Sequence, residues 1–193
     1  MIIMKFGGTS LGTAQSIQNV FRIVRDRIDL DPVLVVSAHA GVTNSLVEIA
    51  RTAPGGDADV SKIEDFHRRL LDGLDLPVDL LDEQLGEMAD LVRGMTLVSE
   101  ASPRVRDLLL SFGERCSTRL VAAYFNQQGM EAQAVDAFEV GLRTDGNFGC
   151  ARPLADDGRI AENMSKIEGV PILTGFLGRD PDGNITTLGR NGS

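Results

Sequence analysis

The feature that most constrains the fold is a pattern that occurs twice near the start of the chain. A short apolar run is followed by a loop of small residues, and then by apolar residues at helical spacing. Residues 2–6 form the first run and end in Gly7-Gly8. Residues 33–36 form the second, a continuous and largely β-branched run typical of a parallel strand covered on both faces. Strand–loop–helix units repeated in this way predict a doubly wound α/β domain.

Apolar spacing predicts most of the remaining elements. The first helix is expected over residues 17–28, the second from residue 45, a helical excursion over about 54–102, and a long helix over about 103–128. Two further strands are expected at residues 132–135 and 170–173, with a hairpin whose turn is 181–184 and whose flanks are 176–177 and 185–188.

Composition excludes several classes of protein. The chain has 193 residues, with 19 Lys and Arg against 28 Asp and Glu, and the net charge of −9 argues against a nucleic-acid partner. No apolar run approaches the ~20 residues of a membrane span. Two cysteines and two histidines are too few for a disulfide framework or a zinc cluster. We therefore expect a cytoplasmic domain with no metal held by its own residues.

The first candidate motif is Lys5 to Ser10, at the end of a strand and just before a helix. Paired glycines let the backbone approach an anion, and a helix N-terminus supplies N–H groups and a positive dipole end. The motif is not a Walker A loop, because the Lys precedes the glycines. An ordinary strand–helix turn with an exposed Lys explains the local pattern equally well.

The second motif, residues 37–44, also follows a strand. The hydroxyls of Ser37 and Thr43 could face a ligand in the crevice where open α/β sheets bind one. His39 invites a role as general base. A loop histidine without a catalytic role is the better interpretation, because the sequence shows no carboxylate partner nearby.

Two later motifs carry charge in unusual settings. Gly113 and Glu114 lie within an otherwise apolar helix, where both are costly unless Glu114 meets a polar group; an exposed pair or a helix kink is the alternative. Cys116 is best interpreted as core filler.

Arg190 stands between glycines, so its guanidinium could bind a carboxylate or phosphate, although a surface loop explains this stretch too.

Together these blocks resemble the signatures of aspartate kinase, in the same order and at similar spacing, over residues 1–193. They read KFGGTS, SAHAGVTN, SFGERCS and TTLGRNGS. Arg143-Thr144-Asp145 with Phe148-Gly149, and Gly175-Phe176, are similar to further family elements. One departure is His39, where the family more usually has Ala, Met or Ser.

The resemblance implies the amino-acid kinase fold, a three-layer αβα sandwich with a mostly parallel central sheet, here incomplete at the C-terminal side. Residues 1–193 are expected to be the N-terminal part of the kinase domain, holding the phosphate loop and the amino-acid substrate. The nucleotide-binding half and the regulatory ACT domains are expected to be absent.

The implied reaction is transfer of the γ-phosphoryl group of MgATP to the β-carboxylate of L-aspartate, the entry to lysine, threonine and methionine synthesis. The residues implied to act on the ATP phosphates, with Lys5 also catalytic, are Lys5, Gly7, Gly8, Thr9 and Ser10. Those implied to bind aspartate are Thr43, Glu114, Phe176, Arg190 and Ser193. Mg²⁺ is expected to be held mainly by the nucleotide phosphates.

Two alternatives stay open. One is a kinase for another acidic amino acid, of the acetylglutamate or glutamate type, although those relatives lack the block around Glu114. The other is a short form that binds aspartate without catalysis. We expect residues 1–193 alone to be inactive, and the full-length parent to be a homo-oligomer without nucleic-acid or membrane partners.

Overall fold

The computed structural model describes residues 1–189, and its centre is a four-stranded parallel sheet. The strand order is β1-β2-β4-β3. The strands are β1 (Ile2–Phe6), β2 (Pro32–Val36), β3 (Ala132–Val135) and β4 (Val170–Thr174). Phe6 pairs with Val36, and Val36 with Thr174, so the carboxyl ends of these three strands meet at one edge of the sheet.

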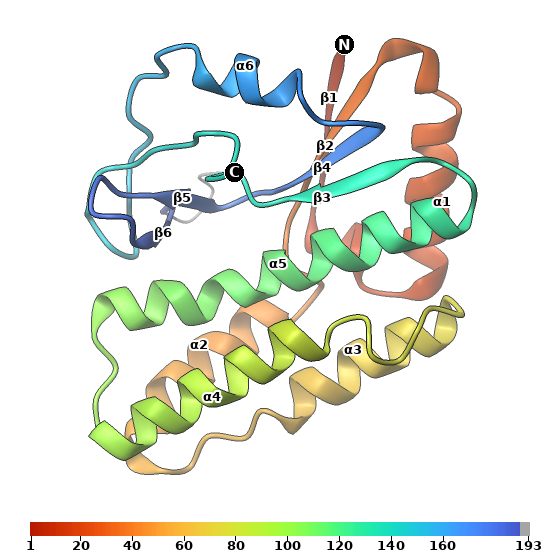
Figure 1. Ribbon diagram of the computed structural model, residues 1–193. Helices are drawn as coiled ribbons and strands as arrows, with labels where there is room; N and C mark the ends of the chain where they lie inside the picture. The colour runs from red at the N-terminus through yellow and green to blue at the C-terminus, as the bar shows by residue number, and fades with distance from the viewer. Residues whose placement is uncertain (190–193) are drawn as a thin grey trace.

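Six α-helices and a hairpin surround this sheet in the described part of the chain (Figure 1). The helices are α1 (Ala14–Arg25), α2 (Val42–Thr52), α3 (Ser61–Gly73), α4 (Asp82–Val98), α5 (Pro103–Gln127) and α6 (Arg159–Met164). Short 3-10 turns lie at Gly8–Leu11, Ile28–Leu30 and Ala53–Gly55. The antiparallel hairpin consists of β5 (Leu177–Arg179) and β6 (Ile185–Thr187).

The main core lies between α5 and one face of the sheet. Leu34 of β2, Ile172 of β4 and Leu120 of α5 are all fully buried in it. The long helix begins cleanly because the Ser102 hydroxyl accepts from the N–H of Val105 and Pro103 occupies the first helical position. As a result α5 runs the length of the domain and carries its charged residues up to the carboxyl edge of the sheet.

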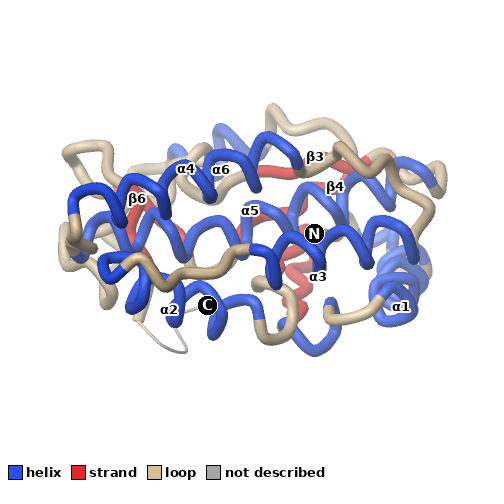
Figure 2. The backbone as a smooth tube through the Cα atoms, turned by 90° about the horizontal axis from the view of Figure 1, so that it is seen from below, coloured by secondary structure: helices blue, strands red, loops and turns tan. Residues whose placement is uncertain are grey.

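Helices α3 and α4 form the expected helical excursion and pack on other helices rather than on the sheet. Figure 2 looks onto this side of the molecule, with the strands behind the helices. Thr96 of α4 donates from its hydroxyl to the carbonyl of Ala53, which fixes the end of α4 against the turn after α2. The excursion therefore covers α2 and α5 as an outer layer.

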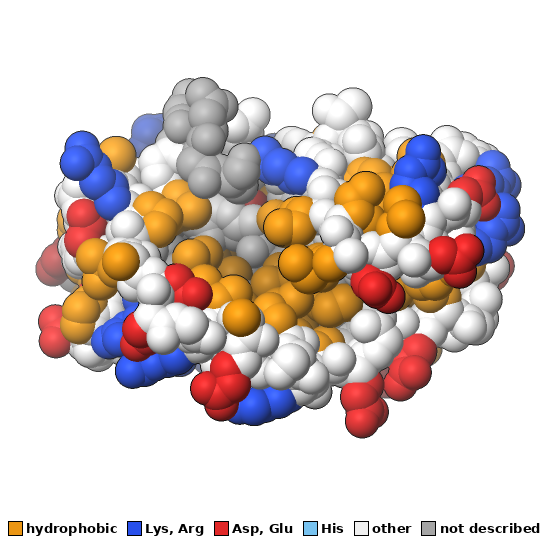
Figure 3. Space-filling model, turned by 90° about the horizontal axis from the view of Figure 1, so that it is seen from above, with side chains coloured by type: hydrophobic (Ala, Val, Ile, Leu, Met, Phe, Trp, Pro, Cys, Tyr) orange, Lys and Arg blue, Asp and Glu red, His pale blue; other side chains and the backbone are white. Residues whose placement is uncertain are grey.

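The opposite face of the sheet is covered only in part by α6. A small cluster of Val33, Val135, Val140 and Leu173 packs there. Next to it a cavity of about 1230 Å³ opens between the sheet and α6, and Figure 3 shows the hydrophobic side chains that gather in this hollow. Ile3 on the edge strand is 67% exposed at its rim.

The α/β prediction is confirmed, including the parallel sheet, the long helix and the hairpin. The first helix begins and ends three residues earlier than its spacing predicted. It ends at Arg25, and Ile28 begins a separate 3-10 turn with its side chain 42% exposed. Within residues 1–189 no helix is both long and apolar enough to cross a membrane.

Candidate functional site

Two loops leave neighbouring strands at the carboxyl edge of the sheet. We call residues 7–11, after β1, the glycine loop, and residues 37–41, after β2, the serine loop. Lys5 lies two residues before the first, with its side chain exposed. Gly7 is exposed and extended, and the N–H of Ser10 donates to its carbonyl over 2.9 Å. The glycine loop therefore offers backbone and hydroxyl groups close to a lysine.

The N-terminus of α1 does not serve the glycine loop in the way that the sequence predicted. A 3-10 turn, Gly8–Leu11, forms most of the loop, and α1 begins only at Ala14. Thr13 caps the helix, because its hydroxyl accepts from the N–H of Ser16 while the Ser16 hydroxyl accepts from the N–H of Thr13. The capping box therefore engages the N–H groups of Thr13 and Ser16 within the helix start itself.

The glycine loop and the serine loop touch through their backbones. The N–H of Ala40 donates to the Gly8 carbonyl over 3.1 Å. A Cβ atom at Gly8 would lie 2.7 Å from the Ala38 carbonyl oxygen, which is closer than such atoms approach. Gly8 is therefore required for this contact as well as for any approach of a ligand.

Glu114 projects from α5 into the serine loop. Its side chain is 4% exposed, and its Oε1 accepts from the N–H of Ala38 over 3.1 Å. Burial raises the pKa of this carboxyl group to about 7, although the bond from Ala38 acts in the opposite direction. The polar partner that a buried Glu requires is thus the backbone of the serine loop.

The residues next to Glu114 explain how α5 comes so close. A Cβ atom at Gly113 would lie 2.8 Å from the Cβ of Ala38, so any larger residue would push the helix away. One turn further on, the Ser117 hydroxyl donates to the carbonyl of Ser37 over 2.9 Å. The motif thus combines a glycine that lets α5 approach the serine loop, a buried carboxylate that accepts from this loop and a hydroxyl that donates to it.

Two other aspartate-site candidates, Thr43 and Phe176, lie on elements at the same edge. Thr43 is half-buried in the first turn of α2. Phe176 follows Gly175, whose N–H donates to the Val36 carbonyl over 2.8 Å. Phe176 is itself in the left-handed region, at φ 52°, a conformation that is strained for a bulky side chain. Such strain is common at ligand sites.

Arg190 and Ser193 lie outside the described residues, but the segment leading to them is anchored by an aspartate that the sequence analysis missed. Asp107 of α5 is 1% exposed and accepts from the N–H and hydroxyl of Thr187 and from the N–H of Gly149. Burial raises the pKa of Asp107, although these hydrogen bonds act in the opposite direction. The RTD…FG segment and β6 are therefore tied to the same helix as Glu114.

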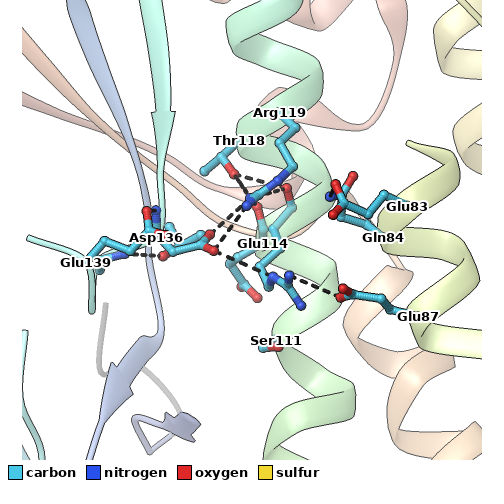
Figure 4. Close-up of polar contacts among 12 residues, drawn as sticks. Glu83, Gln84, Glu87, Ser111, Glu114, Thr118, Arg119, Asp136 and Glu139 are labelled. Atoms are coloured by element: carbon cyan, nitrogen blue, oxygen red, sulfur yellow. Dashed lines mark hydrogen bonds and ion pairs between the residues drawn. The ribbon is translucent and has the colours of Figure 1, made fainter. Parts of the chain in front are cut away.

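A second buried carboxylate, Asp136 at the end of β3, was also missed. Arg119 of α5 donates to both of its oxygens, over 3.0 and 3.1 Å, and Arg115 approaches within 3.6 Å (Figure 4). Arg115 also pairs with Glu87 of α4. The bonds to Asp136 raise the pKa of Arg119 despite its partial burial. Helix α5 is thereby held to the end of β3 and to α4 by residues one and five positions after Glu114.

His39 and Cys116 are both buried. His39 lies in the serine loop, as expected; it is 1% exposed, and its Nδ1 lies 2.7 Å from the carbonyl oxygen of Leu11. Cys116 is 1% exposed, and burial raises the pKa of its thiol to about 12. An inert core cysteine fits both observations.

A comparison with protein families identifies the family of this chain. A model described as the amino acid kinase family matches residues 1–193, the whole chain. The chain belongs to the amino acid kinase family. Its parallel sheet with helices on both sides is the fold found in the solved aspartokinases described next.

Among curated proteins, this amino acid kinase chain is similar to aspartokinases. It is 35% identical to chloroplastic aspartokinase 1 of Arabidopsis thaliana, covering 99% of this chain and 36% of that protein. It is 31% identical to lysine-sensitive aspartokinase 3 of Escherichia coli K12, covering 100% of this chain and 44% of that protein. The chain thus spans less than half the length of either relative.

Solved structures agree. E. coli aspartokinase III in complex with aspartate and ADP, in its R-state, superposes with a TM-score of 0.85 at 30% identity, over 100% of this chain and 44% of that one. The same enzyme with lysine and aspartate, in its T-state, gives 0.87 at 31% identity over the same shares.

Proposed function

We propose that this chain is the aspartate- and phosphate-binding part of an aspartate kinase, which transfers the γ-phosphoryl group of ATP to the β-carboxylate of L-aspartate. The observation that carries the proposal is the buried Glu114 carboxylate, held in the serine loop directly beside the glycine loop. This juxtaposition suits a substrate that has both an ammonium group and an acceptor carboxylate. The likeness to aspartokinases over the whole chain supports the same conclusion.

Phosphoryl transfer leaves the protein with positioning and charge stabilisation. In our proposal Lys5 neutralises charge on the phosphates from its exposed position at the end of β1. The backbone of Gly7 and Gly8 and the hydroxyls of Thr9 and Ser10 surround the same group. Because the chain carries a net charge of −9, attraction of two anionic substrates must be local to these groups.

In our proposal, aspartate is held by residues from separate parts of the chain. Glu114 pairs with the α-ammonium group, which favours its ionised form and offsets the effect of burial. Arg190 binds a carboxylate through its two-pronged guanidinium. Thr43, Phe176 and Ser193 complete the proposed site.

Mg²⁺ and ATP are the proposed cofactors. Residues 1–189 contain no group of three His, Cys, Asp or Glu side chains that could hold a metal ion. In our proposal the nucleotide phosphates carry the magnesium ion, and Lys5 supplies positive charge from the protein. When bound, the ion neutralises developing phosphate charge.

We further propose that residues 1–193 act as part of a longer, homo-oligomeric and cytoplasmic enzyme whose remaining length binds the adenosine. The relatives are more than twice as long as this chain. Proximity and orientation supply about 7–11 kcal/mol of a bimolecular barrier. Residues 1–193 alone should therefore show no turnover, and their apolar hollow should promote self-association.

A coupled ADP-release assay tests the proposal. The full-length protein should turn over with MgATP only when aspartate is added, and glutamate and acetylglutamate serve as competing acceptors. If either competitor were turned over in preference, that competitor, and not aspartate, would be the substrate. Sustained, aspartate-dependent turnover by monodisperse residues 1–193 would contradict the need for a longer enzyme. Size-exclusion chromatography with light scattering of the full-length protein measures its oligomeric state.

A further inference from the structure

The two histidines of the chain meet in its interior. His39 of the serine loop and His67 of α3 are 1% and 0% exposed, and their ring centroids are 5.3 Å apart in an edge-to-face arrangement. Phe66 completes the cluster, with its centroid 5.8 Å from His39 and 5.5 Å from His67. The cluster thus joins the outer helical layer to a loop of the candidate site.

His39 also joins the serine loop to the glycine loop. Its Nδ1 lies 2.7 Å from the Leu11 carbonyl oxygen, and because a carbonyl can only accept, Nδ1 carries the proton and donates. Leu11 is the last residue of the 3-10 turn that begins at Gly8. The bond from Ala40 to Gly8 is the backbone counterpart of this contact. His39 is therefore a side-chain link between the two loops.

The arrangement requires both rings to be neutral. His67 donates from Nδ1 to the Ile63 carbonyl over 2.8 Å, so each neutral ring has a bare Nε2. Both Nε2 atoms are buried and have no hydrogen-bond partner among residues 1–189. A proton on either Nε2 would place an uncompensated charge beside the other ring, which is costly in a buried site.

The surroundings of the pair offer no compensation for that charge within the described chain. The ionisable group that acts on His39 is His67, while the glycine loop contributes the Leu11 carbonyl and α3 also contributes the Phe66 ring. Burial, and then the neighbouring His67, lower the pKa of His39 to about 3, although the Leu11 carbonyl raises it. Burial likewise lowers the pKa of His67.

We propose that His39 is a positioning residue that, in its neutral form, locks the glycine loop against the serine loop, and that protonation of the His39–His67 pair opens this lock. The inference rests on the proposed function, because it assigns these two loops to the phosphates and to aspartate. The lock is closed above the ordinary histidine pKa of 6.5. Below that pH, each unit shifts the balance towards the open form by up to about tenfold per released ring.

Two substitutions separate hydrogen bonding from shape. His39→Asn places an amide N–H near the position of Nδ1, where it can still donate to Leu11, but it does not titrate. His39→Leu fills the space without a donor. At pH 7.5 and saturating substrates, we expect His39→Leu to lower kcat of the full-length protein by about 10- to 100-fold, because misplacing a ligand loop by ~1 Å costs up to that much. His39→Asn should stay within about threefold of wild type, since the bond to Leu11 is kept.

The pH profile is the readout that a purely structural role would not move. Between pH 8 and 5.5 the kcat of wild type should fall more steeply than that of His39→Asn. Glu114 and His67 are present in both proteins, so the difference between the two profiles isolates His39 and its coupling to His67. Parallel profiles would overturn the proposal.

Hydrogen exchange of the amides of residues 7–11 and 37–41 provides a test that needs no catalysis. After correction for intrinsic rates, protection should fall below pH 6.5 in wild type, and at pH 7.5 in His39→Leu, but not in His39→Asn. If the loops behave in this way while no aspartate-dependent turnover is found, the proposed function fails and the lock stands. Protection that is unchanged down to pH 5, or His39→Asn as impaired as His39→Leu, would overturn the lock. If His39→Leu does not fold, wild type and His39→Asn compared across pH still decide.

Discussion

The glycine loop and the serine loop leave adjacent parallel strands, yet they are built in opposite ways. Gly7 and Thr9 are exposed, and Lys5 stands in solvent next to them. In the serine loop Ala38 and His39 are buried, and Glu114 reaches the loop from a helix far along the sequence. A phosphate can be met by open backbone groups and a surface charge, whereas recognition of an ammonium group by a carboxylate gains from exclusion of water.

The largest expected effect tests the exposed loop. Lys5→Ala should lower kcat of the full-length kinase by roughly 10²-fold or more, the scale for removing one preorganised charge from a transition state. Because the Lys5 side chain is exposed, the melting temperature should change little. Steady-state kinetics and thermal unfolding measure the two quantities. Near-normal turnover would remove Lys5 from the proposed mechanism.

The buried side of the comparison predicts a different kinetic signature. Glu114→Ala should weaken the binding of aspartate far more than the binding of ATP, because leaving a buried substrate charge unpaired costs about 2–5 kcal/mol. Glu114→Gln keeps the shape and an acceptor for the Ala38 N–H, and it separates loss of charge from loss of the loop contact. Arg190→Ala should show the same selectivity. Equal effects on KM for both substrates would mean that these residues hold structure instead of ligand.

A pH dependence follows from the burial of Glu114. With its pKa raised to about 7, the carboxyl group pairs with ammonium above pH 7 and is protonated below it. Aspartate affinity should therefore fall by up to about tenfold per pH unit below 7. The pH dependence of folding stability has the opposite sign. The contribution of Glu114 to stability is fully present below its ordinary pKa of 4.5 and is lost as pH rises through about 7.

Calorimetric titration of aspartate between pH 5.5 and 8 measures this effect. The His39→Asn background removes the contribution of His39, and of its coupling to His67, from the titration. An aspartate affinity that stays constant from pH 8 to 5.5 in that background would contradict the role of Glu114.

The sequence predicted the exposed glycine loop better than the buried serine loop. The glycine loop could be predicted because its chemistry is local: a strand, paired glycines and a lysine lie within a few residues. The contact of Glu114 with Ala38 joins residues on different elements, so spacing showed only that a buried Glu needs a partner. Asp107 and Asp136 gave no signal, since an isolated Asp in a helix or after a strand usually faces solvent.

The interpretation of His39 shows the same limit. The sequence shows no carboxylate partner near His39, which favoured a loop histidine without a catalytic role. The structure instead provides a backbone carbonyl and a second histidine, which come from the glycine loop and from the helical excursion. Packing between distant helices decides such a contact, and periodicity within one segment does not reveal it.

The smallest effects come from two neighbouring glycines that separate structure from ligand binding. Gly8→Ala should destabilise the protein by about 1–3 kcal/mol, because its Cβ would lie 2.7 Å from the backbone oxygen of Ala38. Gly7 has φ −80° and nothing within 4 Å of a built Cβ, so Gly7→Ala should leave the melting temperature within a few degrees of wild type, as a surface change of about 0.5 kcal/mol would. Any rise in KM for ATP in Gly7→Ala then reports crowding of the phosphates alone. If Gly7→Ala left both stability and ATP kinetics unchanged, the phosphates would not approach Gly7, and the proposed phosphate site would reduce to Lys5, Gly8, Thr9 and Ser10.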